Sequence, residues 1–390
     1  MPLPISKSIS NRALIINALS QNKQNSIESL AICDDVDSMQ RVLNSSSNVH
    51  DIGHAGTAMR FLTAYFTIQK GQTNIITGSK RMKQRPIAVL VDSLKELGAE
   101  IEYLENPGFP PLKIKGKELL GGKLQIDSAI SSQYISAIMM IAPYMQKGLT
   151  LELQGKVVSR TYIFMTHQIM QAYGAKISIN KNIINIQPQA YISSQYRVEG
   201  DWSAASYYYE ILAIKGRGTH KLNGLYLPSV QGDSLQTSVW EQLGVTTEID
   251  NKNGIIISAH SCSVKHLDYD FVDMPDLVQS FVVACCLKNI TFRFSGVETL
   301  RIKETDRISA LINELSKLGY ILQAEGDKVI VWDGKKQEAQ KNIKIATYND
   351  HRMAMAFAPA ALFFKDLTIL NPEVVSKSFP DYWKELEQIL

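Results

Sequence analysis

The spacing of apolar residues along the chain alternates between a helical period and short strand-like runs, and this alternation repeats. At four places an amphipathic helix pattern ends at a glycine, and a short run of strand-forming residues follows. The four glycines are Gly98, Gly174, Gly244 and Gly319. They lie about 75 residues apart. Because a glycine after the last helical residue commonly supplies the left-handed conformation that ends a helix, the pattern predicts helix, turn and strand in successive copies.

Each copy continues into a predicted pair of strands joined by a turn. The first strands are expected at residues 100–103, 176–179, 246–249 and 321–323. The second strands are expected at residues 112–114, 183–186, 254–257 and 328–332. A chain of 390 residues has room for about five or six such copies. We therefore predict an α/β (α+β) fold of two lobes, each built from about three repeated βαβ-type units.

A break in this pattern near the middle of the chain marks the expected boundary between the lobes. Asn223, Gly224 and Pro228 interrupt the strand and helix patterns around residues 225–229. No long Gly/Ser linker accompanies the break, so the connection is expected to act as a hinge.

The composition is that of an ordinary globular protein. Hydrophobic residues make up 45% of the chain and charged residues 20%, and the formal net charge of +3 is too small for a typical nucleic-acid binder. No apolar run reaches the roughly 18 residues of a membrane span, and the first ten residues match neither a signal nor a transit peptide. We therefore expect a cytoplasmic protein without a membrane or nucleic-acid partner.

The four cysteines do not have the spacing of a metal site. Cys285 and Cys286 are adjacent within an apolar run, and Cys33 and Cys262 lie far from each other. Buried free thiols are the simplest interpretation, and no metal site is expected.

Hydroxyl residues or glycine, several followed by cations, stand at the start of several predicted helices. Such starts occur at residues 6–12, 56–60, 131–133 and 159–162. Backbone N–H groups at a helix start attract anions. Ordinary N-capping is the simpler explanation for any one of them. Four together favour a ligand with several negative charges.

Two further segments, residues 301–307 and 348–353, concentrate charge immediately before an apolar helix pattern. The helical period begins at Ile308, so Lys303, Glu304 and Arg307 are expected at or just inside a helix start. Cations are unusual there because the helix dipole already favours anions, unless a bound anion is shared between them. A solvated helix start with ion pairs is the alternative.

Acid–base candidates are few. Asp276 precedes the apolar run that begins at Leu277, and Glu304 lies next to Lys303. Both also have structural interpretations, Asp276 as a helix N-cap and Glu304 as an ion-pair partner. His351 is as consistent with a structural role as with a catalytic one. The absence of a P-loop or GxGxxG pattern disfavours nucleotide chemistry.

Eight segments, in order along the chain, resemble motifs of the 5-enolpyruvylshikimate-3-phosphate (EPSP) synthase family. They are residues 7–12, 55–60, 81–86, 131–133, 198–201, 301–307, 349–354 and 377–382. The resemblance implies a two-lobed inside-out α/β barrel of βαβαββ units whose cleft closes on ligand. It also implies that residues 1–7 join residues 228–390 in a C-terminal lobe, that residues 8–227 form the N-terminal lobe, and that hinges lie near 7–8 and 225–230.

The resemblance further implies transfer of the enolpyruvyl group of phosphoenolpyruvate to the 5-hydroxyl of shikimate 3-phosphate, with release of phosphate. The reaction belongs to the shikimate pathway to chorismate and aromatic amino acids and needs no cofactor. The enzyme would be a monomer, and glyphosate would compete with phosphoenolpyruvate.

Site residues are carried over from the resemblance by motif. Shikimate 3-phosphate would contact Lys7, Ser8, Arg12, Ser131, Ser132, Gln133, Ser159, Tyr162, Asp276, Thr299 and Lys303. Phosphoenolpyruvate would contact Lys7, His54, Gly56, Thr57, Arg85, Gln133, Arg307, Arg352 and Lys377. Asp276 would accept the 5-hydroxyl proton, and Glu304 would protonate the methylene carbon. Lys7 or Lys377 would assist departure of the phosphate.

Three positions depart from the family pattern. His54 and Phe61 stand where the family usually has Asn and Pro, and Thr299 stands where it often has Asn.

Two other functions are alternatives to this one. A sister transferase acting on UDP-N-acetylglucosamine normally has a reactive loop cysteine, but Cys33, the only cysteine of the expected N-terminal lobe, lies far from residues 80–86. A non-catalytic polyanion binder would require a higher net charge.

Overall fold

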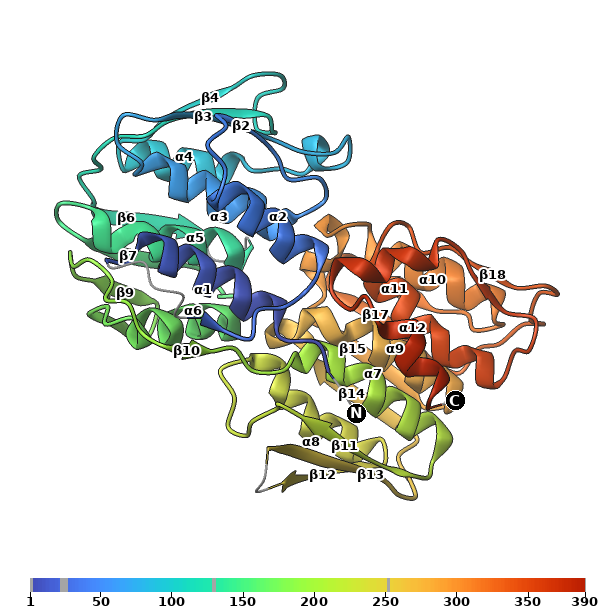
Figure 1. The fold of residues 1–390 in the computed structure, drawn as a ribbon. Helices are drawn as coiled ribbons and strands as arrows, with labels where there is room; N and C mark the ends of the chain where they lie inside the picture. Colours follow the sequence, from blue (N-terminus) through green and yellow to red (C-terminus); the bar gives the residue numbers. More distant parts are fainter. Residues whose placement is uncertain (1–2, 22–26, 128–130, 251–252, 390) are drawn as a thin grey trace. The chain divides into compact units, whose positions relative to one another are not determined.

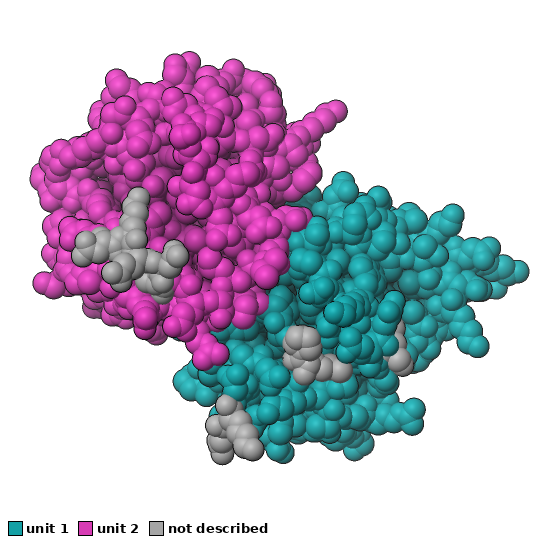
Figure 2. Space-filling model, in the orientation of Figure 1, with its two compact units in different colours: residues 1–4, 199–390 teal, residues 5–198 magenta. Residues whose placement is uncertain are grey.

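The computed structural model describes residues 3–21, 27–127, 131–250 and 253–389 of the chain (Figure 1). The chain forms two compact units. Unit 1 comprises residues 1–4 and 199–390, and unit 2 comprises residues 5–198 (Figure 2). Both units contain helices and sheets, so the predicted mixed α/β class is confirmed.

Unit 2 contains six α-helices among its described residues. They are α1 (Lys7–Leu19), α2 (Asp34–Leu43), α3 (Gly56–Thr67), α4 (Ala88–Glu96), α5 (Ser132–Ile141) and α6 (Arg160–Ala172). Its strands are β1 (Ile27–Glu28), β2 (Val49–Asp51), β3 (Thr73–Thr77), β4 (Glu100–Tyr103), β5 (Leu112–Lys115), β6 (Gly122–Asp127), β7 (Leu149–Gln154), β8 (Ile177–Asn180), β9 (Ile183–Ile186) and β10 (Tyr196–Arg197).

Unit 1 likewise contains six α-helices in the part that is described. They are α7 (Trp202–Lys215), α8 (Gln236–Gln242), α9 (Val278–Leu287), α10 (Arg307–Lys317), α11 (His351–Phe357) and α12 (Tyr382–Glu387). Its strands are β11 (Thr219–Asn223), β12 (Val245–Asp250), β13 (Gly254–Ala259), β14 (His266–Asp270), β15 (Thr291–Ser295), β16 (Gln323–Glu325), β17 (Val329–Trp332), β18 (Lys344–Ile345) and β19 (Thr368–Ile369).

Three four-stranded sheets repeat one arrangement, so the predicted repeat is present in three complete copies among the described residues, rather than the expected five or six. Their strand orders are β2-β3-β5-β4, β6-β7-β9-β8 and β14-β15-β17-β16. In each sheet the first two strands pair in parallel and the others pair antiparallel. Each parallel pair is joined through a helix (α3, α5 or α9), and a second helix (α4, α6 or α10) leads to the hairpin, so each repeat is a βαβαββ unit.

The glycines that define the repeat have the backbone conformation that the sequence predicted. Gly98, Gly174, Gly244 and Gly319 all have a positive φ, between +81° and +101°. At Gly244 an added Cβ would also lie 2.8 Å from the carbonyl oxygen of His260, so only glycine fits this turn without a shift.

The boundary between the units lies earlier than the sequence predicted. The chain passes between the units after Pro4 and after Val198. The expected positions were near residues 7–8 and 225–230. Leu225, inside the expected hinge, is fully buried in the hydrophobic core of unit 1. The turn signals around it therefore end strand β11 within unit 1.

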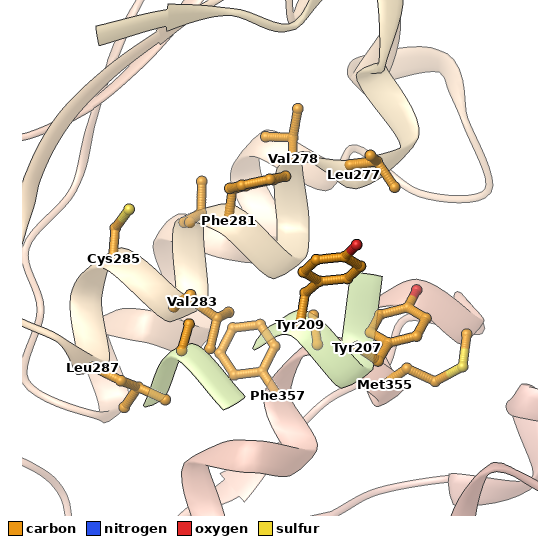
Figure 3. Close-up of a cluster of buried hydrophobic side chains, with 14 of the residues drawn as sticks. Tyr207, Tyr209, Leu277, Val278, Phe281, Val283, Cys285, Leu287, Met355 and Phe357 are labelled. Carbon is orange, nitrogen blue, oxygen red and sulfur yellow. The ribbon is translucent and has the colours of Figure 1, made fainter. Parts of the chain in front are cut away.

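The core of unit 1 surrounds helix α9. Every residue of α9 is buried, as expected for a helix that is apolar on all sides (Figure 3). The ring of Phe281 stacks on Trp240 with centroids 4.0 Å apart and contacts Phe271 at 5.1 Å. Cys285 and Cys286 are fully buried free thiols, which confirms their predicted role.

Among the described residues, no helix combines the length and the apolar character required to span a membrane.

Candidate active site

Each βαβαββ repeat places candidate site residues at the same two points, where a strand of the parallel pair ends and the next helix begins. These residues are Gly56 and Arg85 in the first repeat, Ser131 and Ser159 in the second, and Asp276 and Arg307 in the third. Ligand sites of α/β proteins commonly lie beyond the carboxyl ends of parallel strands, where helix N-termini also attract anions. The repetition therefore gives each repeat the same opportunity to bind an anionic group.

Arg307 is the centre of the charged cluster in unit 1. This first residue of α10 is buried, and its guanidinium contacts three carboxylates. Nη1 lies 3.0 Å from Oδ1 of Asp276, Nη2 lies 3.1 Å from Oε2 of Glu304, and Nε lies 2.7 Å from Oδ2 of Asp350. The planar fork of an arginine can serve three acceptors in this way, whereas a lysine ammonium cannot reproduce the geometry.

Asp276 is held by two further cations. Nη2 of Arg352 lies 2.9 Å from Oδ2, and Nζ of Lys303 lies 3.3 Å from Oδ1. Burial alone would raise the pKa of Asp276, but Arg352, Lys303 and Arg307 together hold it well below its ordinary value. The N-cap residues of the short 3₁₀ turn and of α9 are Met274 and Leu277, so Asp276 does not occupy the N-cap position that was the alternative interpretation.

Glu304 is the second carboxylate of the cluster. Its Oε1 accepts a hydrogen bond from Nζ of Lys377 at 2.6 Å, opposite its contact with Arg307. Lys303 and Glu304 precede α10, whose N-cap is Asp306, so only Arg307 lies inside the helix as the sequence predicted. Since Asp306 already accepts from the N–H of Ser309, the helix start has its own anionic cap.

The helix starts of unit 2 lie close to one another. Nε2 of Gln133, near the start of α5, donates to Oγ1 of Thr57 at the start of α3, at 3.2 Å. Helices α1, α3, α5 and α6 also pack against one another. Ser131 accepts from the N–H of Gln133 as the N-cap of α5, whereas no side chain caps α3 or α6. The predicted helix starts of α3 and α5 therefore lie side by side within this unit.

Arg12 is a buried cation whose hydrogen-bond partners are uncharged. Its guanidinium donates to Oγ1 of Thr166 at 2.8 Å, to Oγ of Ser136 at 3.3 Å and to the carbonyl oxygen of Ser8 at 2.8 Å. Burial lowers the pKa of Arg12 to about 10. Tyr162 contacts the guanidinium through its ring, 5.8 Å away. A buried cation without a carboxylate partner in the described chain favours an anionic ligand.

Lys7 differs from Arg12 in having an internal counterion. Its Nζ lies 3.1 Å from Oδ2 of Asp35, which is almost fully buried. Both residues lie in the first turn of a helix, Lys7 in α1 and Asp35 in α2. The pairing fixes the lysine at the helix start, next to Ser8.

Gly56 leaves the space that the guanidinium of Arg85 occupies. A Cβ added at Gly56 would lie 2.5 Å from Nη1 of Arg85 and 2.8 Å from Nη1 of Arg60. The residue after Arg85 is anchored as well, because the hydroxyl of Tyr134 donates to the carbonyl oxygen of Pro86 at 2.6 Å. Arg85 is thereby held against the start of α3.

The positions that depart from the family pattern have defined surroundings. His54 is exposed, and its Nδ1 lies 3.0 Å from Oγ of Ser79. Phe61 is buried, with its ring 5.2 Å below the guanidinium of Arg12. The buried Oγ1 of Thr299 has no hydrogen-bond partner among the described residues.

Two buried acids that contact candidate site residues were not predicted from the sequence. Asp350, which is fully buried, binds Arg307 and accepts from the N–H of Arg352 at 2.9 Å as the N-cap of α11. Its place inside the charged segment 348–353 was the available signal. Asp35 gave only the weak signal of two adjacent aspartates, Asp34 and Asp35. His351 is buried and contacts Ser378 through Nδ1.

This arrangement defines a class of protein. Carboxylates held among arginines and lysines in unit 1, together with cationic helix starts in unit 2, are suited to acid–base chemistry on small polyanionic substrates. The chain belongs to the EPSP synthase family: the family model described as EPSP synthase (3-phosphoshikimate 1-carboxyvinyltransferase) matches residues 40–386.

Individual relatives agree with this family. The chain is 50% identical over 387 residues to a 3-phosphoshikimate 1-carboxyvinyltransferase of Bacteroides fragilis, covering 99% of this chain and 94% of the relative. It is 36% identical over 419 residues to the enzyme of that name from Haemophilus ducreyi, covering 99% and 94%. A solved EPSP synthase structure from Acinetobacter baumannii has the same fold, with a TM-score of 0.78 at 20% identity, covering 100% of this chain and 95% of that one.

Proposed function

We propose that this chain transfers the enolpyruvyl group of phosphoenolpyruvate to the 5-hydroxyl of shikimate 3-phosphate and releases phosphate. Family membership supports this reaction. The structural observation that carries it is the pairing of Asp276 and Glu304 on one buried guanidinium, that of Arg307. Two carboxylates in a cationic cluster can exchange protons with a substrate whose negative charge the cluster also binds.

The proposed contacts to shikimate 3-phosphate lie mainly in unit 2. Ser131, Ser132 and Ser159, at or beside the starts of α5 and α6, would bind the phosphate through hydroxyl and backbone N–H groups. Ser8 and Arg12 would bind the carboxylate. Further contacts would come from Lys7, Gln133, Tyr162, Asp276, Thr299 and Lys303.

The proposed contacts to phosphoenolpyruvate are divided between the units. Unit 2 would contribute Lys7, His54, Gly56, Thr57, Arg85 and Gln133, and unit 1 would contribute Arg307, Arg352 and Lys377. The proposed reaction therefore needs both units to contact one molecule of phosphoenolpyruvate. Glyphosate, an anion of similar size with a phosphonate and a carboxylate, would compete for the same cations.

The chemistry would be addition followed by elimination. The 5-hydroxyl oxygen bonds to carbon 2 of phosphoenolpyruvate while Asp276 takes the hydroxyl proton and Glu304 gives a proton to carbon 3. Glu304 then takes a proton back from the new methyl group and the double bond re-forms. The bond between carbon 2 and the phosphate oxygen breaks, and Asp276 gives its proton to the departing phosphate. Lys7 would neutralise the departing phosphate.

We also propose that the two units are the lobes of an inside-out α/β barrel that closes on its substrates. The repeated βαβαββ units support this architecture. The proposed enzyme acts as a cytoplasmic monomer. Closure would exclude water, which could otherwise add to the activated enol.

Release of phosphate from phosphoenolpyruvate, measured with two different acceptors, tests the proposal. We expect release with shikimate 3-phosphate and none with UDP-N-acetylglucosamine. Asp276→Asn and Glu304→Gln should each lower kcat by about 10²–10⁴, because each removes a proton-transferring group at constant size. Far-ultraviolet circular dichroism should show that both variants are folded. Release only with the sugar nucleotide, or full activity in both variants, would contradict the proposal.

A further inference from the structure

Resting on the proposed function, we propose that Glu314 and Tyr348 form a positioning pair that sets the geometry of Arg307 and Arg352. Neither member of the pair belongs to the substrate contacts proposed above. They act through a strained turn that delivers Asp350 to both arginines.

The turn before Asp350 has an unusual backbone. Tyr348 and Asn349 have φ angles of +55° and +56°, so two consecutive non-glycine residues adopt the left-handed conformation. Residues other than glycine rarely adopt it singly, and strained backbone of this kind persists only when its surroundings enforce it. Something in the structure must therefore hold this turn.

Glu314 on α10 is the group that holds it. This carboxylate is fully buried, and its Oε1 accepts a hydrogen bond from the hydroxyl of Tyr348 at 2.7 Å. Its Oε2 accepts from the N–H of Ala346 at 2.9 Å and from Nζ of Lys317 at 2.6 Å. One carboxylate thus binds residues 346 and 348 on the approach to the turn. Burial, followed by this hydrogen bond, raises the pKa of Tyr348 to about 12, so the hydroxyl remains a donor throughout the neutral range.

This turn sets the position of Asp350. The N–H of Asp350 donates to the carbonyl oxygen of Thr347 at 2.8 Å, across the two left-handed residues. The carboxylate of Asp350 then accepts from Nε of Arg307 at 2.7 Å and from the N–H of Arg352 at 2.9 Å. Arg307 starts α10 and Arg352 lies in the first turn of α11, two helices that contact each other in unit 1 (Figure 1).

Glu314 and Arg307 lie on the same helix, which closes the chain of contacts. The path runs from α10 through Glu314 and Tyr348 to the turn, and returns through Asp350 to the start of α10. Loosening one hydrogen bond of this ring would let Asp350 shift relative to Asp276, and with it the guanidinium of Arg307 and the backbone at Arg352. Since Arg307 and Arg352 are proposed to bind phosphoenolpyruvate, that substrate should be affected more than shikimate 3-phosphate.

Tyr348→Phe tests the pair by removing a single hydroxyl from a partly exposed side chain. We expect KM for phosphoenolpyruvate to rise about tenfold, the scale of one hydrogen bond to a charged group, and KM for shikimate 3-phosphate to stay within about twofold. Tyr209→Phe is the matched control. Its hydroxyl bonds to Thr247 at the same 2.7 Å, but β12, which carries Thr247, contributes no candidate site residue. This control should leave both KM values unchanged.

A second variant tests the strain itself. In Tyr348→Phe combined with Asn349→Gly, the glycine adopts the left-handed conformation without steric cost, so KM for phosphoenolpyruvate should return toward the wild-type value. A double variant no better than Tyr348→Phe would overturn the claim that the pair maintains this turn.

Other outcomes separate the inference from the proposed function. If Tyr348→Phe only lowers thermal stability, as Tyr209→Phe should, and leaves both KM values unchanged, the pair is purely structural and the inference is wrong. Wild-type protein without turnover on phosphoenolpyruvate and shikimate 3-phosphate would instead contradict the proposed function on which the inference rests.

Discussion

At the scale of single residues, the surroundings of Asp276 decide what its carboxylate can do. Arg307, Arg352 and Lys303 keep its pKa well below the ordinary value, which makes it a weak base without substrate. An incoming phosphate or carboxylate would take up part of that positive charge. The pKa of Asp276 would then rise, so arrival of the anionic substrate would itself increase the basicity that the first proton transfer requires.

Asp233 is another buried acid in unit 1, and the proposed mechanism does not use it. Its side chain contacts the hydroxyl of Ser203, while its Oδ1 has no hydrogen-bond partner among the described residues. Burial first, and then the charge of Asp276, raise the pKa of Asp233 from 3.8 to about 7. The stability associated with this neutral carboxyl is therefore fully present below about pH 4, the range in which the unfolded chain also keeps the group neutral. It is lost as the pH rises toward 7.

Asp233→Asn should make the protein more stable at alkaline pH. The unfolded chain ionises this group first, so the wild type loses stability between about pH 4 and pH 7, and the uncharged amide does not. We expect the gain in the free energy of unfolding, measured with urea, to be about 2–3 kcal/mol larger at pH 8.5 than at pH 5. Ser203→Ala keeps the carboxyl and removes a hydrogen bond that lowers its pKa, so this variant should show a pH dependence at least as large as that of the wild type. A gain that is the same at both pH values would contradict this assignment.

At the scale of elements, the site is produced by repetition of one βαβαββ unit. In all three complete repeats the segments after the two parallel strands carry the candidate residues, although the chemistry differs from serines to arginines to carboxylates. Helix starts supply N–H groups in every repeat, and the side chains at those starts decide which anion or proton they serve. This arrangement explains why the candidate residues are spread over most of the chain.

Gly56→Ala tests one such helix start. An added methyl group would meet Nη1 of Arg85 at 2.5 Å, and the flexible guanidinium would move away. We expect KM for phosphoenolpyruvate to rise about tenfold, the loss of roughly one charge-assisted contact, with little change in thermal stability. Gly216→Ala is the control, because its φ of +65° predicts lower stability without any candidate site residue being displaced. An unchanged KM in Gly56→Ala would show that the position of Arg85 does not matter for binding.

At the scale of the whole molecule, local sequence patterns predicted the helices and strands far better than the side-chain contacts between them. The helix starts at Gly56, Ser131 and Ser159, and the strand pairs after the four glycines, follow from periodicity and turn chemistry, and the structure confirms them. The ion pair between Arg307 and Asp350 joins residues 43 positions apart, and no local pattern indicates it.

The misplaced boundary has a similar cause. A strand end with Asn, Gly and Pro gives the same local signal whether or not a new unit follows. Only the burial of the neighbouring side chains, such as Leu225, shows to which core the segment belongs. The family motifs predicted the candidate site residues. Asp35, which pairs with Lys7, and Glu314, which contacts Tyr348, emerged only from the packing of the helices that carry them.

The most direct test of the account is proton nuclear magnetic resonance of the product formed from phosphoenolpyruvate and shikimate 3-phosphate in D₂O. Addition and elimination through Glu304 require an exchangeable acid to deliver a deuteron to carbon 3. The account predicts an enolpyruvyl ether at the 5-oxygen whose methylene group contains deuterium. Formation of no ether, or of an ether whose methylene group contains only protium, would contradict it.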